Sequence, residues 1–225
     1  MYEYHPLHIP NPFGGPVLFI PETGSVLEDA AEGSAAYSHG TVLTAGYQSR
    51  GRGRGGGRSW EAEHDASMLA AILIARQYYS VVPAGSSSLR TALALALYLE
   101  ERGLQPQVKW PNDVLLRGRK VSGILIELSA HLIRIGIGMN CLQREFPAEL
   151  RSKATSLLLE GVPGEPVQEH LRRFLPRLKE VMLKPHIVPE VDRRLYRKGE
   201  TCVLLEGGTE HARRLKGIVR GVQED

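Results

Sequence analysis

This chain of 225 residues has little cysteine, little excess charge and no long hydrophobic run. Its two cysteines, Cys141 and Cys202, belong to no CxxC or Cys/His pattern, so neither a disulfide framework nor a structural zinc site is expected. Both should be buried free thiols. No apolar stretch is long enough to cross a bilayer, and the first residues do not resemble a signal peptide. We therefore expect a cytoplasmic protein without a membrane partner.

The charge balance is nearly even, with 28 lysines and arginines against 25 aspartates and glutamates. A strong positive field must then come from local clustering, and nucleic acid is not implied as the main partner. About 16 residues precede the first expected strand, too few for a helix-turn-helix domain. We expect a globular protein that does not bind DNA, and a homodimer is left open.

Hydrophobic patterns predict strands and helices along most of the chain. The expected strands are 17–20, 41–44, 68–75, 114–116, 121–128 and 132–139, and the expected helices are 26–31, 88–102 and 167–183. Pro176 should kink or split the last helix, and Pro185 and Pro189 should mark a linker. From Leu195 onward short apolar runs and the Gly207-Gly208 turn predict a small β module.

The expected strands 114–116, 121–128 and 132–139 are joined by very short connections, which require antiparallel neighbours. Side chains alternate between the faces of a strand, so Ile133, Ile135, Ile137 and Met139 share one face, and Arg134, Gly136, Gly138 and Asn140 share the other. Glycines in a strand allow a close approach to its backbone. Either a flat ligand or a tightly packed helix would explain this face.

The Arg/Gly tract from Gly51 to Trp60 places three arginines among glycines. Backbone amides and guanidinium groups in such a loop can surround a phosphate or a carboxylate. The tract also matches GxGxxG but lacks a clear helix start, which disfavours a dinucleotide-binding fingerprint. A nucleic-acid-binding Arg/Gly segment stays open as an alternative.

The segment Lys109-Trp110-Pro111-Asn112-Asp113 precedes the first strand of the antiparallel group. Trp110 can stack on a planar group, and Asn112 with Asp113 could hold a hydrated magnesium ion. A turn with a core tryptophan is the alternative. Lys120 then leads an apolar strand, where alternation puts it on the same face as Ser122, and its charge needs a protein carboxylate or a ligand phosphate as partner.

In this order, GRGR with Arg58 and Trp60, KWPNDV, GRKVSGILIE and GIGMN resemble the catalytic domain of biotin protein ligases. The resemblance covers residues 17–160, including Ala154-Thr155-Ser156-Leu157, and the tail looks like the family's small SH3-like domain. It implies an α+β fold, a mixed and mainly antiparallel sheet packed by helices, of the class II aminoacyl-tRNA synthetase-like type. The implied domains are residues 1–186 and 187–225.

The resemblance also implies the activity and its residues. Biotin and ATP would form biotinyl-5'-AMP, and biotin would then pass to a lysine of a biotin carboxyl carrier protein, such as that of acetyl-CoA carboxylase. Lys120, Arg54 and Lys109 would be catalytic, and Asn112 and Asp113 would serve ATP and Mg²⁺, with Asp113 as the metal ligand. Biotin or the adenylate would contact Thr23, Ser25, Gln48, Gly51, Arg52, Gly53, Arg54, Trp60, Lys120, Gly123, Gly136 and Asn140.

The sequence departs from the family pattern at three places. One extra glycine lies among Gly55, Gly56 and Gly57; the Ser-Thr-Asn motif is reduced to Thr23 or Ser25; and the small domain is expected to lack its last strand. Competing interpretations are a lipoate ligase or octanoyltransferase of the same fold, and a cysteine-dependent acyltransferase that uses Cys141 or Cys202. The GRGR loop argues against the first of these.

Overall fold

The computed structural model describes residues 3–33, 37–54, 59–79, 84–206 and 213–223. Within these residues, eight strands form one sheet in the order β1-β2-β3-β4-β8-β7-β6-β5. The strands are β1 His5–Leu7, β2 Val17–Thr23, β3 Val42–Gln48, β4 Ser67–Ala75, β5 Pro106–Lys109, β6 Asp113–Leu116, β7 Arg119–Leu128 and β8 Leu132–Asn140.

The sheet is mixed and mainly antiparallel, which confirms the predicted fold class. β2 and β3 pair in parallel, because helix α1 (Val26–Glu32) forms the crossover between them. The pairs β3–β4, β4–β8, β8–β7, β7–β6 and β6–β5 are antiparallel, as short connections such as Ser129-Ala130 require. The predicted strands and the helix around residues 26–31 are therefore present, with ends extended by a few residues.

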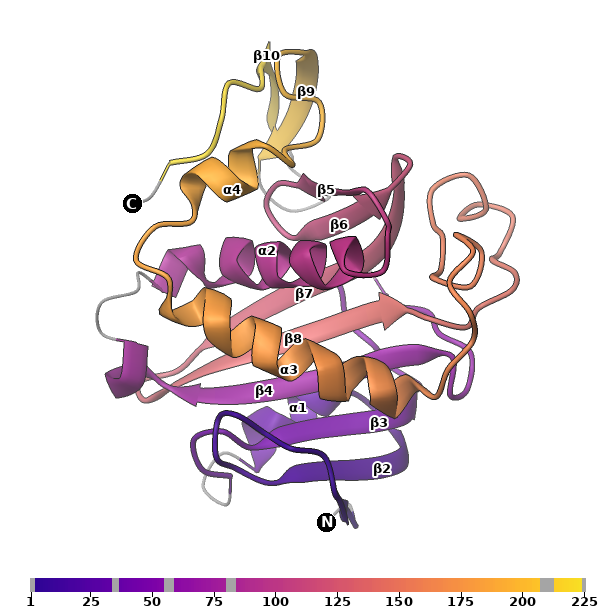
Figure 1. Ribbon diagram of the computed structural model, residues 1–225, viewed down its shortest axis with the longest axis vertical. Helices are drawn as coiled ribbons and strands as arrows, with labels where there is room; N and C mark the ends of the chain where they lie inside the picture. The colour runs from indigo at the N-terminus through magenta and orange to yellow at the C-terminus, as the bar shows by residue number, and fades with distance from the viewer. Residues whose placement is uncertain (1–2, 34–36, 55–58, 80–83, 207–212, 224–225) are drawn as a thin grey trace.

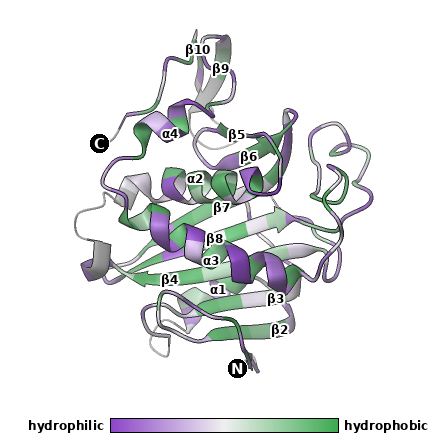
Figure 2. Ribbon diagram, in the orientation of Figure 1, coloured by the Kyte–Doolittle hydropathy of each residue, from purple (hydrophilic) through white to green (hydrophobic). Residues whose placement is uncertain are grey.

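Helices cover the sheet on both faces, as Figure 1 shows. Helices α2 (Ser87–Glu100) and α3 (Val167–Leu183) pack on one face with residues such as Met68, Ile72 and Ile135, all fully buried. Helix α1 packs on the other face against Leu43, Ala71 and Leu73. Alternate residues of β4 thus enter different cores, and Figure 2 colours the central strands mainly as hydrophobic.

The structure around two prolines of the C-terminal half, Pro176 and Pro189, differs from what the sequence predicted. Helix α3 is one continuous helix that contains Pro176, so it is not split, and its apolar side, including Phe174 and Leu178, is fully buried. Burial of that side offsets the loss of a backbone hydrogen bond at the proline. Pro189 lies in the first turn of helix α4 (Val188–Asp192) and not in a linker, because a first-turn residue needs no hydrogen-bond donor.

The tail forms a small antiparallel sheet of β9 (Thr201–Glu206) and β10 (Arg213–Ile218), as the β pattern predicted. The Gly207-Gly208 turn lies outside the described residues. The chain just before β9 covers the edge of β5, since the Val108 N–H donates to the Arg194 carbonyl oxygen at 2.7 Å and the Tyr196 N–H donates to the Val108 carbonyl oxygen at 2.9 Å. The boundary at residue 187 stays a prediction. In the described segments, no helix is long and apolar enough to span a bilayer.

Candidate functional site

The candidate site lies on the sheet face that carries α1, over the glycines of β7 and β8. Gly123 pairs with Gly138 in the ladder. A Cβ atom added to Gly138 would lie 2.5 Å from Cε2 of Trp60, and one added to Gly136 would lie 3.1 Å from Cδ2 of Leu27. The packed helix therefore accounts for Gly136, whereas Gly138 lies under the indole ring of Trp60, and a flat ligand on this face stays a prediction.

A small cavity of about 50 Å³ remains between this glycine floor, α1 and the Arg/Gly loop. Most of the residues predicted to bind biotin or the adenylate line it: Ser25, Gln48, Arg52, Gly53, Arg54, Trp60, Lys120, Gly123 and Gly136. Asn112, which was predicted to serve ATP, lines it as well. Small-molecule pockets usually have roughly 300 Å³ or more. The walls of this first cavity must therefore move apart before it can hold a ligand much larger than water.

A second cavity of about 330 Å³ adjoins the first and shares Arg54, Asn112, Ile124 and Leu125 with it. Trp110 lines this second cavity and is 47% exposed, so the alternative of a core tryptophan is wrong. The remaining lining comes from separate parts of the chain: the start of α2 with the residues before it, Pro111, β7, the start of α4 and the tail. It includes Ser86, Ser88, Leu89, Ile126, Ile187, Val188, Val222 and Gln223.

The Arg/Gly loop is anchored by carboxylates through Arg52. The Arg52 guanidinium lies 3.2 Å from a Glu28 carboxylate oxygen on α1 and 2.9 Å from Glu127 Oε1 on β7. Glu127 also pairs with Arg134 of β8, at 3.4 Å. Arg52 thus ties the loop to both walls of the first cavity. The extra glycine and Arg58 lie outside the described residues.

Lys120 stands at one end of the first cavity. Its Nζ lies 2.6 Å from Asp113 Oδ1 and 5.5 Å from the centre of the Trp60 ring. A protein carboxylate therefore meets its charge, which is one of the two partners expected. The register shifts between Val114 and Leu115, opposite the start of β7. This shift breaks the expected alternation: Lys120 lines the cavity with Gly123, whereas Ser122 is fully buried and donates to the Gly138 carbonyl oxygen at 2.7 Å.

Hydrogen bonds also fix two polar side chains that line the cavity, Gln48 and Asn112. Oε1 of Gln48 accepts from the Val26 N–H at 2.8 Å and so satisfies the first turn of α1, where the Ser25 side chain makes no cap bond. Asn112 Nδ2 donates to the Ile124 carbonyl oxygen at 2.9 Å. Backbone groups thus hold Gln48 and Asn112 where they line the cavity.

Five predicted residues do not line the first cavity: Thr23, Gly51, Lys109, Asp113 and Asn140. Thr23 donates its hydroxyl to Asp29 at 2.6 Å, and Gly51 lies under the Trp60 carbonyl group. Asn140 donates to the Thr155 carbonyl oxygen at 2.9 Å. Lys109 is exposed. Together with Asp113, Lys120 and Asn140 it borders an open groove of about 830 Å³ on the far side of Trp60.

Sequence reasoning missed the apolar wall of the first cavity, although the alternation along the strands carried the signal. Ala70, Leu125 and Ile137 come from β4, β7 and β8, and Val26 and Leu27 come from α1. It also missed Glu28 and Glu127, for which the local sequence contains no signal. Acidic residues on a helix or strand are usually solvated.

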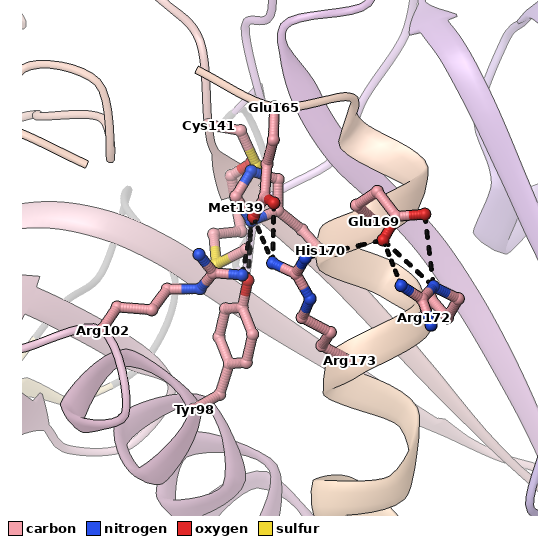
Figure 3. A network of polar contacts seen from close by, with 9 residues as sticks. All are labelled: Tyr98, Arg102, Met139, Cys141, Glu165, Glu169, His170, Arg172 and Arg173. Carbon is pink, nitrogen blue, oxygen red and sulfur yellow. Dashed lines mark hydrogen bonds and ion pairs between the residues drawn. The ribbon is translucent and has the colours of Figure 1, made fainter. Parts of the chain in front are cut away.

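Cys141 lies in a polar network on the opposite face of the sheet, shown in Figure 3. Burial raises the pKa of its thiol to about 12, so it is protonated and cannot serve as the nucleophile of an acyltransferase. The neighbouring His170 shares a 2.6 Å hydrogen bond with the Tyr98 hydroxyl, and burial lowers the pKa of the imidazole to about 4. Cys202 is partly exposed, so the expectation that both thiols are buried holds for Cys141 alone.

In this α+β fold, the glycine floor, the arginine-bearing loop and the adjoining larger cavity together form a candidate small-molecule site. Residues 17–140 match the model of the Biotin/lipoate A/B protein ligase family, and the chain belongs to that family.

Two named ligases are similar to the chain. It is 36% identical over 170 residues to the biotin–[acetyl-CoA-carboxylase] ligase of Mycobacterium tuberculosis. This match covers 71% of this chain and 61% of that protein. It is also 36% identical over 126 residues to the bifunctional ligase/repressor of Bacillus subtilis, covering 52% of this chain and 38% of that protein. The matches thus span less than two thirds of these curated relatives.

A solved structure is similar over most of the chain. The biotin protein ligase from Aquifex aeolicus in complex with biotin and ATP superposes with a TM-score of 0.81 and 29% sequence identity. The match covers 92% of this chain and 88% of that chain.

Proposed function

We propose that this protein is an ATP-dependent biotin protein ligase, which forms biotinyl-5'-AMP and transfers biotin to a lysine of a biotin carboxyl carrier protein. The observation that carries the proposal is the junction of the two cavities, where Arg54 and Asn112 line both and Lys120 closes the end of the first. The first cavity would take biotin and the second the adenosine of ATP. The similarity to biotin ligases supports this substrate choice.

The chemistry needs cations more than a nucleophilic side chain. A biotin carboxylate oxygen attacks the α-phosphorus of ATP, an acyl–phosphate bond forms, and pyrophosphate leaves. Two anionic groups must come together in this step, so Lys120 and Arg54 would stabilise the charge that develops between them. In the second step a neutral carrier lysine attacks the acyl carbon, and AMP leaves with the bonding electrons.

Asp113 offers a single carboxylate for a magnesium ion. In the described part of the chain no group of three histidine, cysteine, aspartate or glutamate side chains could hold a metal. Mg²⁺ in nucleotide-binding proteins is commonly held by one or two carboxylates and the substrate's phosphates, so the residues present fit such an ion. When bound, Mg²⁺ would neutralise part of the triphosphate charge. Asp113 would then exchange the Lys120 ammonium for the metal.

The remaining expectations concern the setting of the enzyme. A cytoplasmic location, a carrier protein and not DNA as macromolecular partner, and a homodimer stay predictions. The Arg/Gly nucleic-acid alternative loses support from the ion pairs of Arg52 with Glu28 and Glu127, because a phosphate backbone would have to displace both carboxylates. Binding to single strands that weakens steeply with salt would favour that alternative.

The first prediction tests the substrate. Purified protein should catalyse the exchange of pyrophosphate into ATP when biotin is added, and not when lipoate or octanoate is added. The reason is that glycines of β7 and β8 form the floor of the first cavity, where a flat fused ring system can lie close to the backbone. Exchange is measured with labelled pyrophosphate, and a reaction without any acid is the control. Exchange with lipoate alone would overturn the substrate assignment.

The second prediction concerns the Arg/Gly loop. Because the first cavity has a volume of only about 50 Å³, the loop must open to admit biotin and should close again over the adenylate. Amide exchange of residues 50–54 and 59–60 should therefore slow when biotinyl-AMP binds. The amides of β4 serve as the internal control, since they are protected in either state. Equal protection of the loop with and without biotinyl-AMP would rule out closure on the ligand.

A further inference from the structure

The backbone of Lys120 is held by a segment outside the main sheet. β8 pairs with β7 from Ser122 onward, so the first residues of β7 extend beyond that ladder. There the Lys120 N–H donates to the Lys153 carbonyl oxygen at 2.7 Å, and the Thr155 N–H donates to the Lys120 carbonyl oxygen at 2.9 Å. Residues 153–155 thus pair with the backbone of Lys120 as a neighbouring strand would.

Thr155 connects this backbone to two other groups. It is fully buried, and its carbonyl oxygen accepts from Asn140 Nδ2 at 2.9 Å. Its hydroxyl donates to Glu160 Oε1 at 2.7 Å. The three polar groups of this one residue therefore reach Lys120, Asn140 and Glu160, so any displacement of Thr155 is transmitted to two predicted site residues.

Glu160 fixes the other side of Lys120. Its side chain is 2% exposed and lies 2.6 Å from Arg119 Nη2 and 3.5 Å from Arg117 Nε. Arg117 and Arg119 flank the Gly118 turn that leads into β7. A buried carboxylate is costly unless donors surround it, and this one lines neither of the two cavities. Its donors join the hairpin before Lys120 to the segment that pairs with Lys120.

We propose that Thr155 and Glu160 are positioning residues that hold the Lys120 backbone, so that its ammonium group can exchange Asp113 for the carboxylate and phosphate of the substrates. The proposal rests on the proposed function of the site. Neither residue touches substrate. They act by fixing the Lys120 backbone. The lysine side chain is long and flexible, and if its backbone also moved, its ammonium group would spend little time at the position that the reaction needs.

The test uses two substitutions with matched controls. Glu160→Gln removes the charge that Arg117 and Arg119 share, and Thr155→Val removes the hydroxyl at nearly constant volume. We expect each to lower biotin-dependent pyrophosphate exchange on the order of tenfold or more. Thr155→Ser keeps the hydroxyl and should keep most of the activity. Glu169→Gln makes the same chemical change in an exposed ion pair with Arg172 on α3 and should have no effect.

A double-mutant cycle separates positioning from a general effect on the fold. In the Lys120→Ala background, single-turnover adenylation should lose little more when Glu160→Gln or Thr155→Val is added, since no ammonium is left to position. An equal fold-loss with and without Lys120 would overturn the proposal, as would exchange within twofold of the parent for both single variants. If Glu160→Gln fails to fold, the Thr155→Val and Thr155→Ser pair carries the test.

A readout without substrate distinguishes this proposal from the proposed function. Exchange of the Lys120 and Thr155 amides with solvent should be faster in Glu160→Gln than in the parent, while the amides of β4 stay unchanged. Unchanged Lys120 and Thr155 amides would overturn the positioning role whatever the enzyme's substrate. If the parent showed no biotin-dependent pyrophosphate exchange but Glu160→Gln still lost protection of the Lys120 and Thr155 amides, the proposed function alone would be refuted.

Discussion

Replacing Lys120 by alanine should lower biotin-dependent adenylation at least a hundredfold. A cation aimed in advance at a developing charge in a water-poor site contributes roughly 3 kcal/mol to transition-state stabilisation. The Lys120 ammonium lies 2.6 Å from Asp113 and 5.5 Å from the centre of the Trp60 ring, and it would act in this way once bound substrates shield its side chain, which is 36% exposed. The rate is measured by pyrophosphate exchange with saturating biotin and ATP.

Lys179→Ala is the matched control for this substitution. Lys179 projects from α3 on the opposite face of the sheet, where its Nζ donates to the Pro12 carbonyl oxygen at 3.2 Å. The Lys179→Ala variant should therefore keep full adenylation activity. Exchange by Lys120→Ala within about threefold of the parent would show that Lys120 has only a structural role, namely to neutralise Asp113.

Substitution of Gly138 by alanine should raise the KM for biotin by about tenfold or more and lower kcat less. The new Cβ would lie 2.5 Å from Trp60 Cε2 and 2.8 Å from Cδ2, so the indole must move or the methyl group must occupy the floor on which a ligand would lie. Loss of about 1.4 kcal/mol of binding corresponds to tenfold in affinity. Titration calorimetry measures the affinity for biotin, and steady-state rates give the KM and kcat.

Gly164→Ala is the control for the glycine substitution, because its Cβ would meet Leu142 at 3.6 Å, which is ordinary contact. Its affinity for biotin should match that of the parent. If Gly138→Ala bound biotin as tightly as the parent, the glycine floor would serve only the packing of Trp60, and the first cavity would not be the biotin site.

The fold follows largely from local patterns in the sequence. The apolar runs of β4, β7 and β8 are long, and the short connections around Gly118 and Ser129 require antiparallel pairing of β6 with β7 and of β7 with β8. The pairing of β4 with β8 joins distant segments and did not follow from local patterns. The period-two alternation along β8 separates the isoleucine side from the glycine side without any knowledge of neighbours. Pro176 is the exception, since the buried apolar side of α3 outweighs the preference of a single residue.

The motifs likewise identified most of the cavity residues, because Gly53, Lys120 and Gly123 occur in short segments of recognisable spacing. The sequence could not reveal which charges meet. Arg52 and Glu127 are 75 positions apart, and their ion pair depends on how α1 and the loop pack on the sheet.

The sequence by itself determined strands β2, β3, β4, β6, β7 and β8, helices α1, α2 and α3, and the chemical types gathered in the Arg/Gly loop, Lys109 to Asp113 and the start of β7; it did not predict β1, β5 or α4. The tertiary structure alone decided that a register shift separates Lys120 from Ser122, that Thr155 and Glu160 hold Lys120, and that Ile187 and Val222 complete the second cavity. The physical reason is range. Periodicity and turn chemistry act over a few residues, whereas ion pairs and cavity walls join segments whose distance is fixed only when the whole core packs.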